Sequence, residues 1–373
     1  MRAPLLSLLL VACAGSNGAD TAAGGTPPGG TPQGADGAVF KGPLAEGSEV
    51  EWVRLDAEGF ETDEEGEAYI TNHLGDYSLT MPSEGFLKIE AEGAYFDEAT
   101  GGQKEVPIKI ATYVRLEPGE PVAVQINLLT DLLSTRMLDR LQDGQEYDDA
   151  LVELEDELFD ALDIGFGEPL ALSAHQVSPW EDTYESAYLF AVSAVIAEAA
   201  EAQRLGGEGD IDTLLEPIRE DFRDDGGIEP GISSVLADAE LTLDPDLAVT
   251  SIRMLAADLG EDRPIPDPHR VLDSDGDGVV NADDNCRYVA NPDQAADGGY
   301  SWGDACDDRL LAISTGDETG CGVRAVDGSL VCWDSSLGRF GGTAPSPLVM
   351  PAGRVSPWPA VDGLATGATS MSP

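Results

Sequence analysis

Short runs of alternating apolar and polar residues between 37 and 127 predict β-strands. The alternation in VEWVRL and YSLTM places one face of each strand inward and the other toward water. Turn-forming residues in EGF, LGDY and SEGF separate the runs. We therefore expect residues 37–127 to form a small antiparallel β-sandwich.

From Leu128 the spacing of the apolar residues changes to that of helices. The stripes are Leu129, Leu133, Met137 and Leu141, then Leu151, Leu154, Leu158 and Ala161 or Leu162. The run YESAYLFAVSAVIAEAAEAQ is apolar nearly all round and predicts a central buried helix. IDTLLEPIREDF and PDLAVTSIRMLAADL predict two more helices, the second with Asp244 as its N-cap. Residues 128–262 are thus expected to form a helical bundle, followed by a proline-punctuated linker at 263–272.

The amino terminus, MRAPLLSLLLVACAGS, combines a cationic Arg2 with a short apolar run that ends at Cys13. It resembles a bacterial lipoprotein signal, which implies that residues 1–12 are removed and that Cys13 is acylated and anchors the protein to a membrane. Ala14 stands where inner-membrane retention signals of that class have Asp, which favours the outer membrane. The alternative is an ordinary secretory signal that is cut elsewhere. Residues 13–36, rich in Gly, Pro and Thr, predict a flexible tether.

The chain carries 71 acidic against 20 basic residues, a formal net charge of −51. Such a charge repels nucleic acid and anionic lipid headgroups, and it favours divalent cations and basic surfaces as partners. General acidity is also expected of a protein adapted to salt. With 373 residues, 42% of them hydrophobic, the chain has room for two or three domains with real cores.

The stretch DSDGDGVVNADDNC, which begins at Asp273, has the oxygen spacing of a twelve-residue calcium loop. Acids occupy positions 1, 3 and 5, glycine position 6, asparagine position 9 and aspartate position 12. Calcium prefers six to eight hard oxygens, and the glycine permits the bend that brings alternate side chains to one point. Position 7, Val279, would contribute its backbone carbonyl. The alternative is a solvated acidic turn.

Residues 273–308, which continue through NPDQ to GDACDD, resemble a thrombospondin type 3 repeat. The resemblance implies carboxylate ligands, an asparagine that acts directly or through water, and a disulfide between Cys286 and Cys306. The implied ligands are Asp273, Asp275, Asp277, Asn281 and Asp284, with the carbonyl of Val279. The family's second acidic loop has lost its acids here, at Ala296, Gly298 and Tyr300, so only the first ion is expected. So short a segment cannot build a core, and metal and disulfide would substitute for one.

Residues 309–345 resemble one repeat of the regulator-of-chromosome-condensation (RCC1) propeller. The matching stretch contains Cys321, Asp327-Gly328, Cys332 and Trp333. A hairpin around Asp327-Gly328 would bring Cys321 and Cys332 together as a second disulfide. Because a propeller needs several blades, a single repeat is expected to be incomplete. Residues 346–373 are expected to form an irregular tail. Residues 37 to about 202 also resemble an uncharacterised module of predicted bacterial lipoproteins.

Together these patterns predict an α+β multidomain chain made of a β-sandwich, a helical bundle, a calcium-loop spacer and an incomplete propeller repeat. None of the three histidines stands in a zinc-binding arrangement, and no P-loop or GxSxG motif occurs. We expect no enzymatic activity. The predicted function is that of a calcium-binding, lipid-anchored envelope protein with an adhesive or scaffolding role toward a surface protein or glycan. The alternative is an envelope hydrolase with an acidic site between the sandwich and the helices.

Overall fold

The computed structural model describes residues 33–57, 59–118, 123–165, 170–203, 211–296 and 302–306, and the backbone of 310–315, 319–324 and 330–334. The predictions for the signal peptide, for Cys13, for most of the tether and for the tail at 346–373 lie outside these residues.

The first seven strands form two sheets. They are β1 (Gln33–Phe40), β2 (Glu49–Leu55), β3 (Glu61–Tyr69), β4 (Asp76–Met81), β5 (Gly85–Asp97), β6 (Gly102–Leu116) and β7 (Ile126–Asn127). One sheet has the order β4-β1-β7 and the other β3-β2-β5-β6. All pairs are antiparallel except β1 with β7, which run parallel. The expectation of a purely antiparallel arrangement was therefore wrong at β7, because β7 reaches β1 from distant sequence instead of through a hairpin.

The alternating sequence of β4 produces the alternating burial that was expected. Tyr77, Leu79 and Met81 are buried, whereas Ser78 and Thr80 between them are exposed. β1 begins at Gln33, inside the predicted tether. The core-facing side of the sheet therefore starts earlier, with Ala35 and Ala38.

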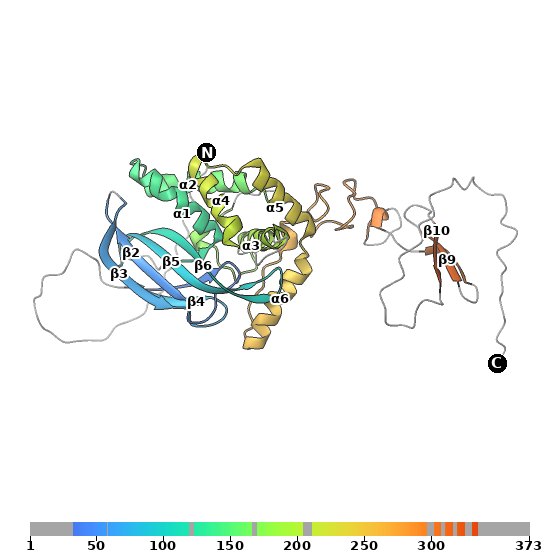
Figure 1. The fold of residues 1–373 in the computed structure, drawn as a ribbon, viewed down its shortest axis with the longest axis horizontal. Coiled ribbons are helices and arrows are strands. Elements are labelled where there is room, and N and C mark those ends of the chain that lie inside the picture. The colour runs from blue at the N-terminus through green and yellow to red at the C-terminus, as the bar shows by residue number, and fades with distance from the viewer. Residues whose placement is uncertain are drawn as a thin grey trace, which may run out of the picture.

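Six α-helices follow the strands in the described residues (Figure 1). They are α1 (Leu128–Gln142), α2 (Tyr147–Leu162), α3 (Tyr184–Gln203), α4 (Asp212–Asp225), α5 (Pro230–Thr242) and α6 (Pro245–Leu259). Asn127 caps α1, since its side chain accepts the N–H of Thr130 while the Thr130 hydroxyl accepts the N–H of Asn127. Asp244 caps α6 by accepting the N–H of Leu247, and Pro245 follows it at the first helical position, as predicted.

The strands and the helices share one hydrophobic core. Phe40 at the end of β1 lies 5.7 Å from the ring of Trp180 and 6.2 Å from the ring of Phe190 on α3, measured between ring centroids. Helix α3 is the buried central helix, with Tyr188 and Phe190 each 1% exposed. The chain thus belongs to the mixed α and β class, and one continuous core spans the predicted boundary at residues 127 and 128.

Residues 263–272, expected to be a linker, lie against the folded body; we call them the strap. Arg263 forms an ion pair with Asp76 of β4, in which its Nη1 is 2.8 Å from Oδ1. The guanidinium carbon also lies 5.7 Å from the ring centroid of Trp180. At the other end Val271 and Leu272 are fully buried in the common core.

Three further strands lie in the region of the predicted propeller repeat. They are β8 (Leu310–Thr315), β9 (Thr319–Arg324) and β10 (Leu330–Asp334). They pair antiparallel in the order β10-β9-β8, and the register places Cys332 opposite Cys321. This register agrees with the expected hairpin, whose turn lies outside the described residues. The bond between the two cysteines stays a prediction.

Candidate metal centre

The acidic loop, residues 273–284, is bent by its own first aspartate. Oδ1 of Asp273 accepts the N–H of Gly276, and Oδ2 accepts the N–H of Gly278, both at 2.9 Å. Gly276 and Gly278 have φ of +73° and +94°, a region that L-residues rarely adopt. The two glycines thus let the backbone fold around the Asp273 carboxylate.

This bend gathers the first three aspartates of the loop. Asp273, Asp275 and Asp277 each offer one carboxylate oxygen, and these oxygens lie within 4.8 Å of one another, so they can hold a metal ion. Burial, followed by repulsion from the carboxylates around it, raises the pKa of Asp275 to about 6. Those neighbours are Asp277, Asp284 and Asp273. The loop thus concentrates negative charge at one point.

Two carboxylate oxygens at this point are buried without a hydrogen-bond partner, Oδ2 of Asp275 and Oδ2 of Asp284. Asp284 is only 9% exposed. Burying a carboxylate oxygen without a partner is costly, and native proteins rarely leave one in this state. A cation held by Asp273, Asp275 and Asp277 would give the Asp275 oxygen its partner, whereas Asp284 lies outside the group of oxygens within 4.8 Å of one another. An all-oxygen donor set suits a hard divalent ion.

The NPDQ segment donates hydrogen bonds to two of the predicted ligands, a role that the loop spacing alone did not indicate. The Gln294 amide donates to Oδ1 of Asp284 at 2.9 Å and to Oδ2 of Asp277 at 3.4 Å. The N–H of Asn291 donates to the same Asp277 oxygen at 2.7 Å. Gln294 has a φ of +49°, which is uncommon for a residue with a side chain. Such contacts orient metal ligands and tune the affinity of the site.

Asn281 at position 9 is fully buried and bonded to Ser274. Its Oδ1 accepts the N–H of Ser274 at 3.0 Å, and its Nδ2 donates to the Ser274 hydroxyl at 2.8 Å. The side chain therefore holds the two halves of the loop together. Its predicted role as a ligand, and that of the Val279 carbonyl, stay predictions.

A disulfide joins Cys286 to Cys306, the pairing that the sequence predicted. The segment from 302 to 306 returns to the loop beside this bond. The N–H of Gly303 donates to the Asn285 carbonyl at 2.9 Å, and the N–H of Asp304 donates to the Ala295 carbonyl at 2.8 Å. The disulfide therefore ties residues 302–306 to the chain segment that follows Asp284.

A second acidic group, Glu49, Glu51 and Glu67, lies on the outer face of β2 and β3. Its oxygens also fall within 4.8 Å of one another. None of its oxygens is among the buried unpaired atoms found in the described residues. It therefore lacks the unsatisfied buried charge that distinguishes the acidic loop.

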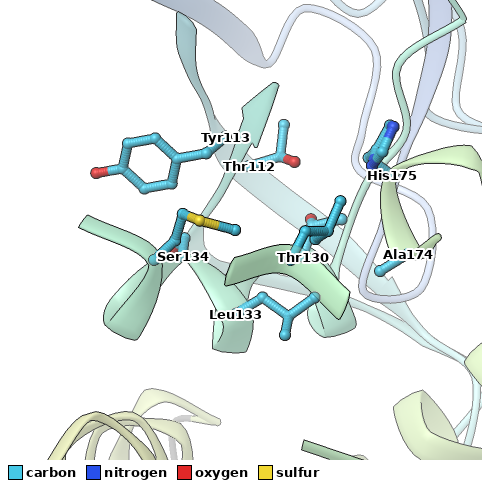
Figure 2. A pocket seen from close by; sticks show the side chains of 9 residues that line it. Thr112, Tyr113, Thr130, Leu133, Ser134, Ala174 and His175 are labelled. Carbon is cyan, nitrogen blue, oxygen red and sulfur yellow. The ribbon is translucent and has the colours of Figure 1, made fainter. Parts of the chain in front are cut away.

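Two cavities between the sheet and the helices are small, whereas an open hollow of about 850 Å³ lies between Arg54 and Arg115 of the sheet and Tyr147 of α2. Figure 2 shows one enclosed by Thr112 and Tyr113 of β6, by Thr130, Leu133 and Ser134 of α1, and by Ala174 and His175. Its volume is about 10 Å³, which is room for one water molecule. A neighbouring cavity beside Phe159 and Tyr188 measures about 20 Å³.

The histidines do not come together into a site. His73 is half exposed and accepts the N–H of Glu46 at 3.3 Å. His269 is 6% exposed and His175 is partly buried, and burial lowers the pKa of His175.

No comparison with known proteins suggests a function for this site. In the part of the chain that the structure describes, no helix has the length and apolar character needed to cross a membrane. No protein-family model matches the chain, and no curated protein matches it either.

Proposed function

We propose that the acidic loop binds one Ca²⁺ as a structural ion. The observation that carries this proposal is the pair of buried, unpaired oxygens, Oδ2 of Asp275 and Oδ2 of Asp284, in a loop whose carboxylates repel one another. They belong to positions 3 and 12 of a loop with calcium-binding spacing and a glycine at position 6. A divalent cation would supply the missing partner of the Asp275 oxygen.

Calcium fits this donor set better than other divalent ions. Zinc prefers nitrogen or sulfur, whereas this cluster offers oxygen, and the nearby Cys286 is already in a disulfide. Magnesium requires near-ideal octahedral geometry and keeps several waters, whereas calcium accepts irregular shells of six to eight oxygens. Extracellular sites of this kind bind calcium at about 0.1 to 1 mM, which suits a constitutively filled structural ion.

The wider proposal is a calcium-binding protein anchored to the cell envelope through acylated Cys13, at the outer membrane and facing the periplasm or the cell surface. Its parts would be a tether, a β-sandwich, a helical bundle, a thrombospondin-type calcium spacer and an RCC1-type repeat. A net charge of −51 favours a basic surface protein or a glycan over nucleic acid as partner. The proposed biological role is adhesion or scaffolding.

Calorimetric titration of the full chain with Ca²⁺ tests the calcium site. We expect about one ion per chain for the native protein and no binding for Asp275→Asn, which keeps the shape of the side chain but removes its charge. Asp283→Asn is the matched control, because Asp283 is an exposed acid beside the ligand Asp284. Loss of binding in Asp283→Asn as well, or no binding at 5 mM Ca²⁺ in the native chain, would overturn the proposal.

Membrane fractionation of cells that express the chain tests the anchor. We expect the native protein in the outer-membrane fraction and Cys13→Ser in the soluble envelope fraction, because acyl chains supply the membrane affinity. A Cys13→Ser variant that remains with the membrane would contradict lipidation at this residue.

The hydrolase alternative would need an acidic cleft between the sheet and the helices. In the described residues, two cavities at this interface hold about 10 and 20 Å³, too little for a substrate. A third, open hollow of about 850 Å³ lies between the sheet, at Arg54 and Arg115, and the start of α2, at Tyr147. The apolar side chains of β6, α1 and α2 fill the space between them. The acids that line the hollow, Asp56, Glu84, Glu117 and Glu146, contribute none of the buried unpaired oxygens found in the described residues, so the acidic loop has the stronger support.

A further inference from the structure

The acidic loop begins inside the core of the folded body. Val271 and Leu272, the two residues before its first ligand, are 0% exposed and belong to the same apolar cluster as helix α3. A spacer that moved independently would instead be preceded by exposed, polar residues. The position of Asp273 is therefore tied to the packing of the helices.

Backbone hydrogen bonds attach the second half of the loop to the strap. The N–H of Asn281 donates to the Leu272 carbonyl, and the N–H of Ala282 donates to the His269 carbonyl, both at 2.8 Å. His269 is 6% exposed, and its Nε2 lies 3.1 Å from Oδ1 of Asp246 on α6. Both halves of the loop are thus attached to the strap, and the strap is attached to α6 through His269.

Glu240 on α5 makes a direct contact with the first ligand. Its Oε1 accepts the N–H of Asp273 at 3.2 Å, and its carboxylate also accepts the N–H of Gly165, which follows α2. One side chain of the helical body therefore bonds both the loop and the connection after α2. Its charge lies close to that of Asp273, and a bound cation would offset their repulsion.

We propose that the acidic loop acts as a latch for the helical body, with Glu240 as the residue that positions its first ligand. A cation that holds the loop in shape also holds the strap and α5 in place. By linkage, the folded helices raise the affinity of the loop for the cation by the same free energy. This inference rests on the proposed calcium site and extends it from a local spacer to the stability of the whole body.

Thermal unfolding of the full chain, followed by helical circular dichroism with and without Ca²⁺, tests the latch. Helices α1 to α6 all lie outside the loop, so their signal reports the body alone. We expect Ca²⁺ at 100 times its Kd to raise the helical Tm by about 5 to 10 °C. Calorimetric binding without any rise in helical Tm would overturn the latch and leave the calcium site standing. Absence of binding would overturn both.

Variants of Glu240 test its positioning role. We expect Glu240→Ala to weaken Ca²⁺ binding about tenfold or more, as loss of a group that orients a metal ligand does. Glu240→Gln keeps an acceptor oxygen and should recover most of the affinity, and Glu220→Ala, at an exposed glutamate of α4, should change nothing. Equal affinity in Glu240→Ala and the native chain would refute this role.

A measurement on the native chain covers the case in which Glu240→Ala does not fold. Hydrogen exchange at the amides of α5 should slow on addition of Ca²⁺, because the latch ties this helix to the loop. Unchanged exchange in α5, with slower exchange confined to residues 273–306, would overturn the latch.

Discussion

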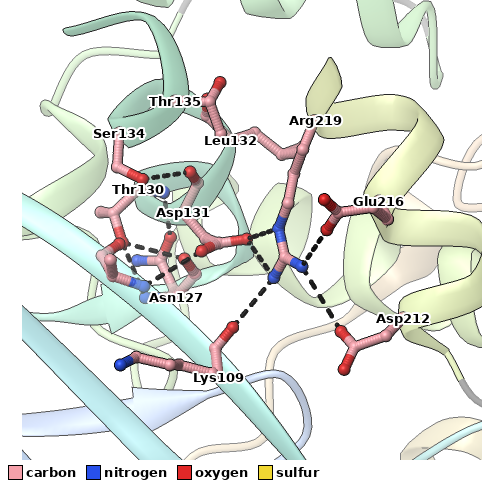
Figure 3. Close-up of polar contacts among 11 residues, drawn as sticks. Lys109, Asn127, Thr130, Asp131, Leu132, Ser134, Thr135, Asp212, Glu216 and Arg219 are labelled. Atoms are coloured by element: carbon pink, nitrogen blue, oxygen red, sulfur yellow. Dashed lines mark hydrogen bonds and ion pairs between the residues drawn. The ribbon is translucent and has the colours of Figure 1, made fainter. Parts of the chain in front are cut away.

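Arg219 on α4 contacts one carboxylate oxygen of Asp131 on α1 through both Nε and Nη2, each at 2.8 Å (Figure 3). The other Asp131 oxygen accepts the N–H of Ala111 on β6 at 3.1 Å, and Arg219 Nη2 also donates to the Lys109 carbonyl at 2.9 Å. One buried pair thus joins two helices to the sheet. Burial raises the pKa of Asp131 to about 6, although Arg219 opposes this rise.

The first prediction is that Asp131 makes stability fall as pH rises from about 4 to about 6. The pKa of its folded-state carboxyl exceeds the ordinary value of 3.8, so the folded chain holds this proton more tightly than the unfolded chain does. Its stabilising contribution is complete below about pH 4 and is lost as pH rises through about 6. Asp131→Asn cannot titrate, so the free energy of unfolding of the native chain relative to this variant should decrease by roughly 3 kcal/mol over this window.

Urea unfolding at several pH values, with calcium held constant, checks this prediction. The acids of the loop titrate equally in both proteins and cancel in the difference. Asp131→Ala serves as a second variant, because it leaves the N–H of Ala111 and the Arg219 guanidinium without their partner. It should destabilise by about 2 to 4 kcal/mol at all pH values. A flat difference between native and Asp131→Asn would contradict the raised pKa.

The second prediction concerns two glycines that share a positive φ but differ in the room available for a Cβ atom. Gly42 has φ +59°, and a Cβ there would lie 1.8 Å from the Phe96 carbonyl oxygen. Gly47 has φ +85°, with nothing within 4 Å of its Cβ position. Gly42→Ala should therefore cost about 2 to 5 kcal/mol of unfolding free energy, and Gly47→Ala only about 1 to 2 kcal/mol. Equal costs in urea unfolding would show that the close approach at Gly42 is relieved.

The third prediction concerns a buried ion pair between Lys41 and Glu98, both 0% exposed. Lys41 Nζ lies 3.3 and 3.4 Å from the two carboxylate oxygens, and the Ser193 hydroxyl bonds the same carboxylate. Removal of one partner leaves an uncompensated buried charge, so Lys41→Met should cost about 3 to 5 kcal/mol. The double variant Lys41→Met, Glu98→Gln should cost less than the sum of the two single variants. A double-mutant cycle in urea measures the coupling, and strict additivity would contradict it.

The fourth prediction is local unfolding on loss of the disulfide. The bond links residues that are 20 apart in sequence, and a loop of about this size typically contributes roughly 3 kcal/mol. In the double variant Cys286→Ala, Cys306→Ser, tryptic cleavage at Arg287 should accelerate about 100-fold, because it follows the population of the opened segment. Cleavage at Arg253 on α6 is the internal control. A comparable acceleration there would show global unfolding instead.

Most helices could be predicted because their apolar residues follow a helical period, but α5 was missed. Its sequence, PGISSVLADAELT, begins with Pro and Gly, and Leu236 and Ala239 are its only buried residues. Strand β3, ETDEEGEAY, lacks the alternation of apolar residues that predicts a strand, because glutamates fill an edge strand whose side chains are largely exposed. In both elements neighbouring chain segments decide the structure more than local propensity does.

The acidic loop could be located from sequence because calcium ligands follow a fixed local spacing. Gln294, Asn291 and Glu240 could not be, since their contacts with the loop depend on how distant backbone returns to it. The prediction that the strap is an exposed linker was wrong for a similar reason. Prolines usually indicate an exposed connection, and only tertiary packing reveals that Val271 and Leu272 enter the core.

The contact between Asp76 and Arg263 sets a limit on how early the body can be completed during synthesis. The two residues are 187 positions apart, so at about 5 to 20 residues per second a ribosome makes the second some 10 to 40 s after the first. During that interval the ion pair with this carboxylate is missing, and the side chains beneath the strap remain uncovered. The growing chain therefore has to remain in an incomplete state for tens of seconds, and a chaperone that shields apolar surface would be most useful to it then.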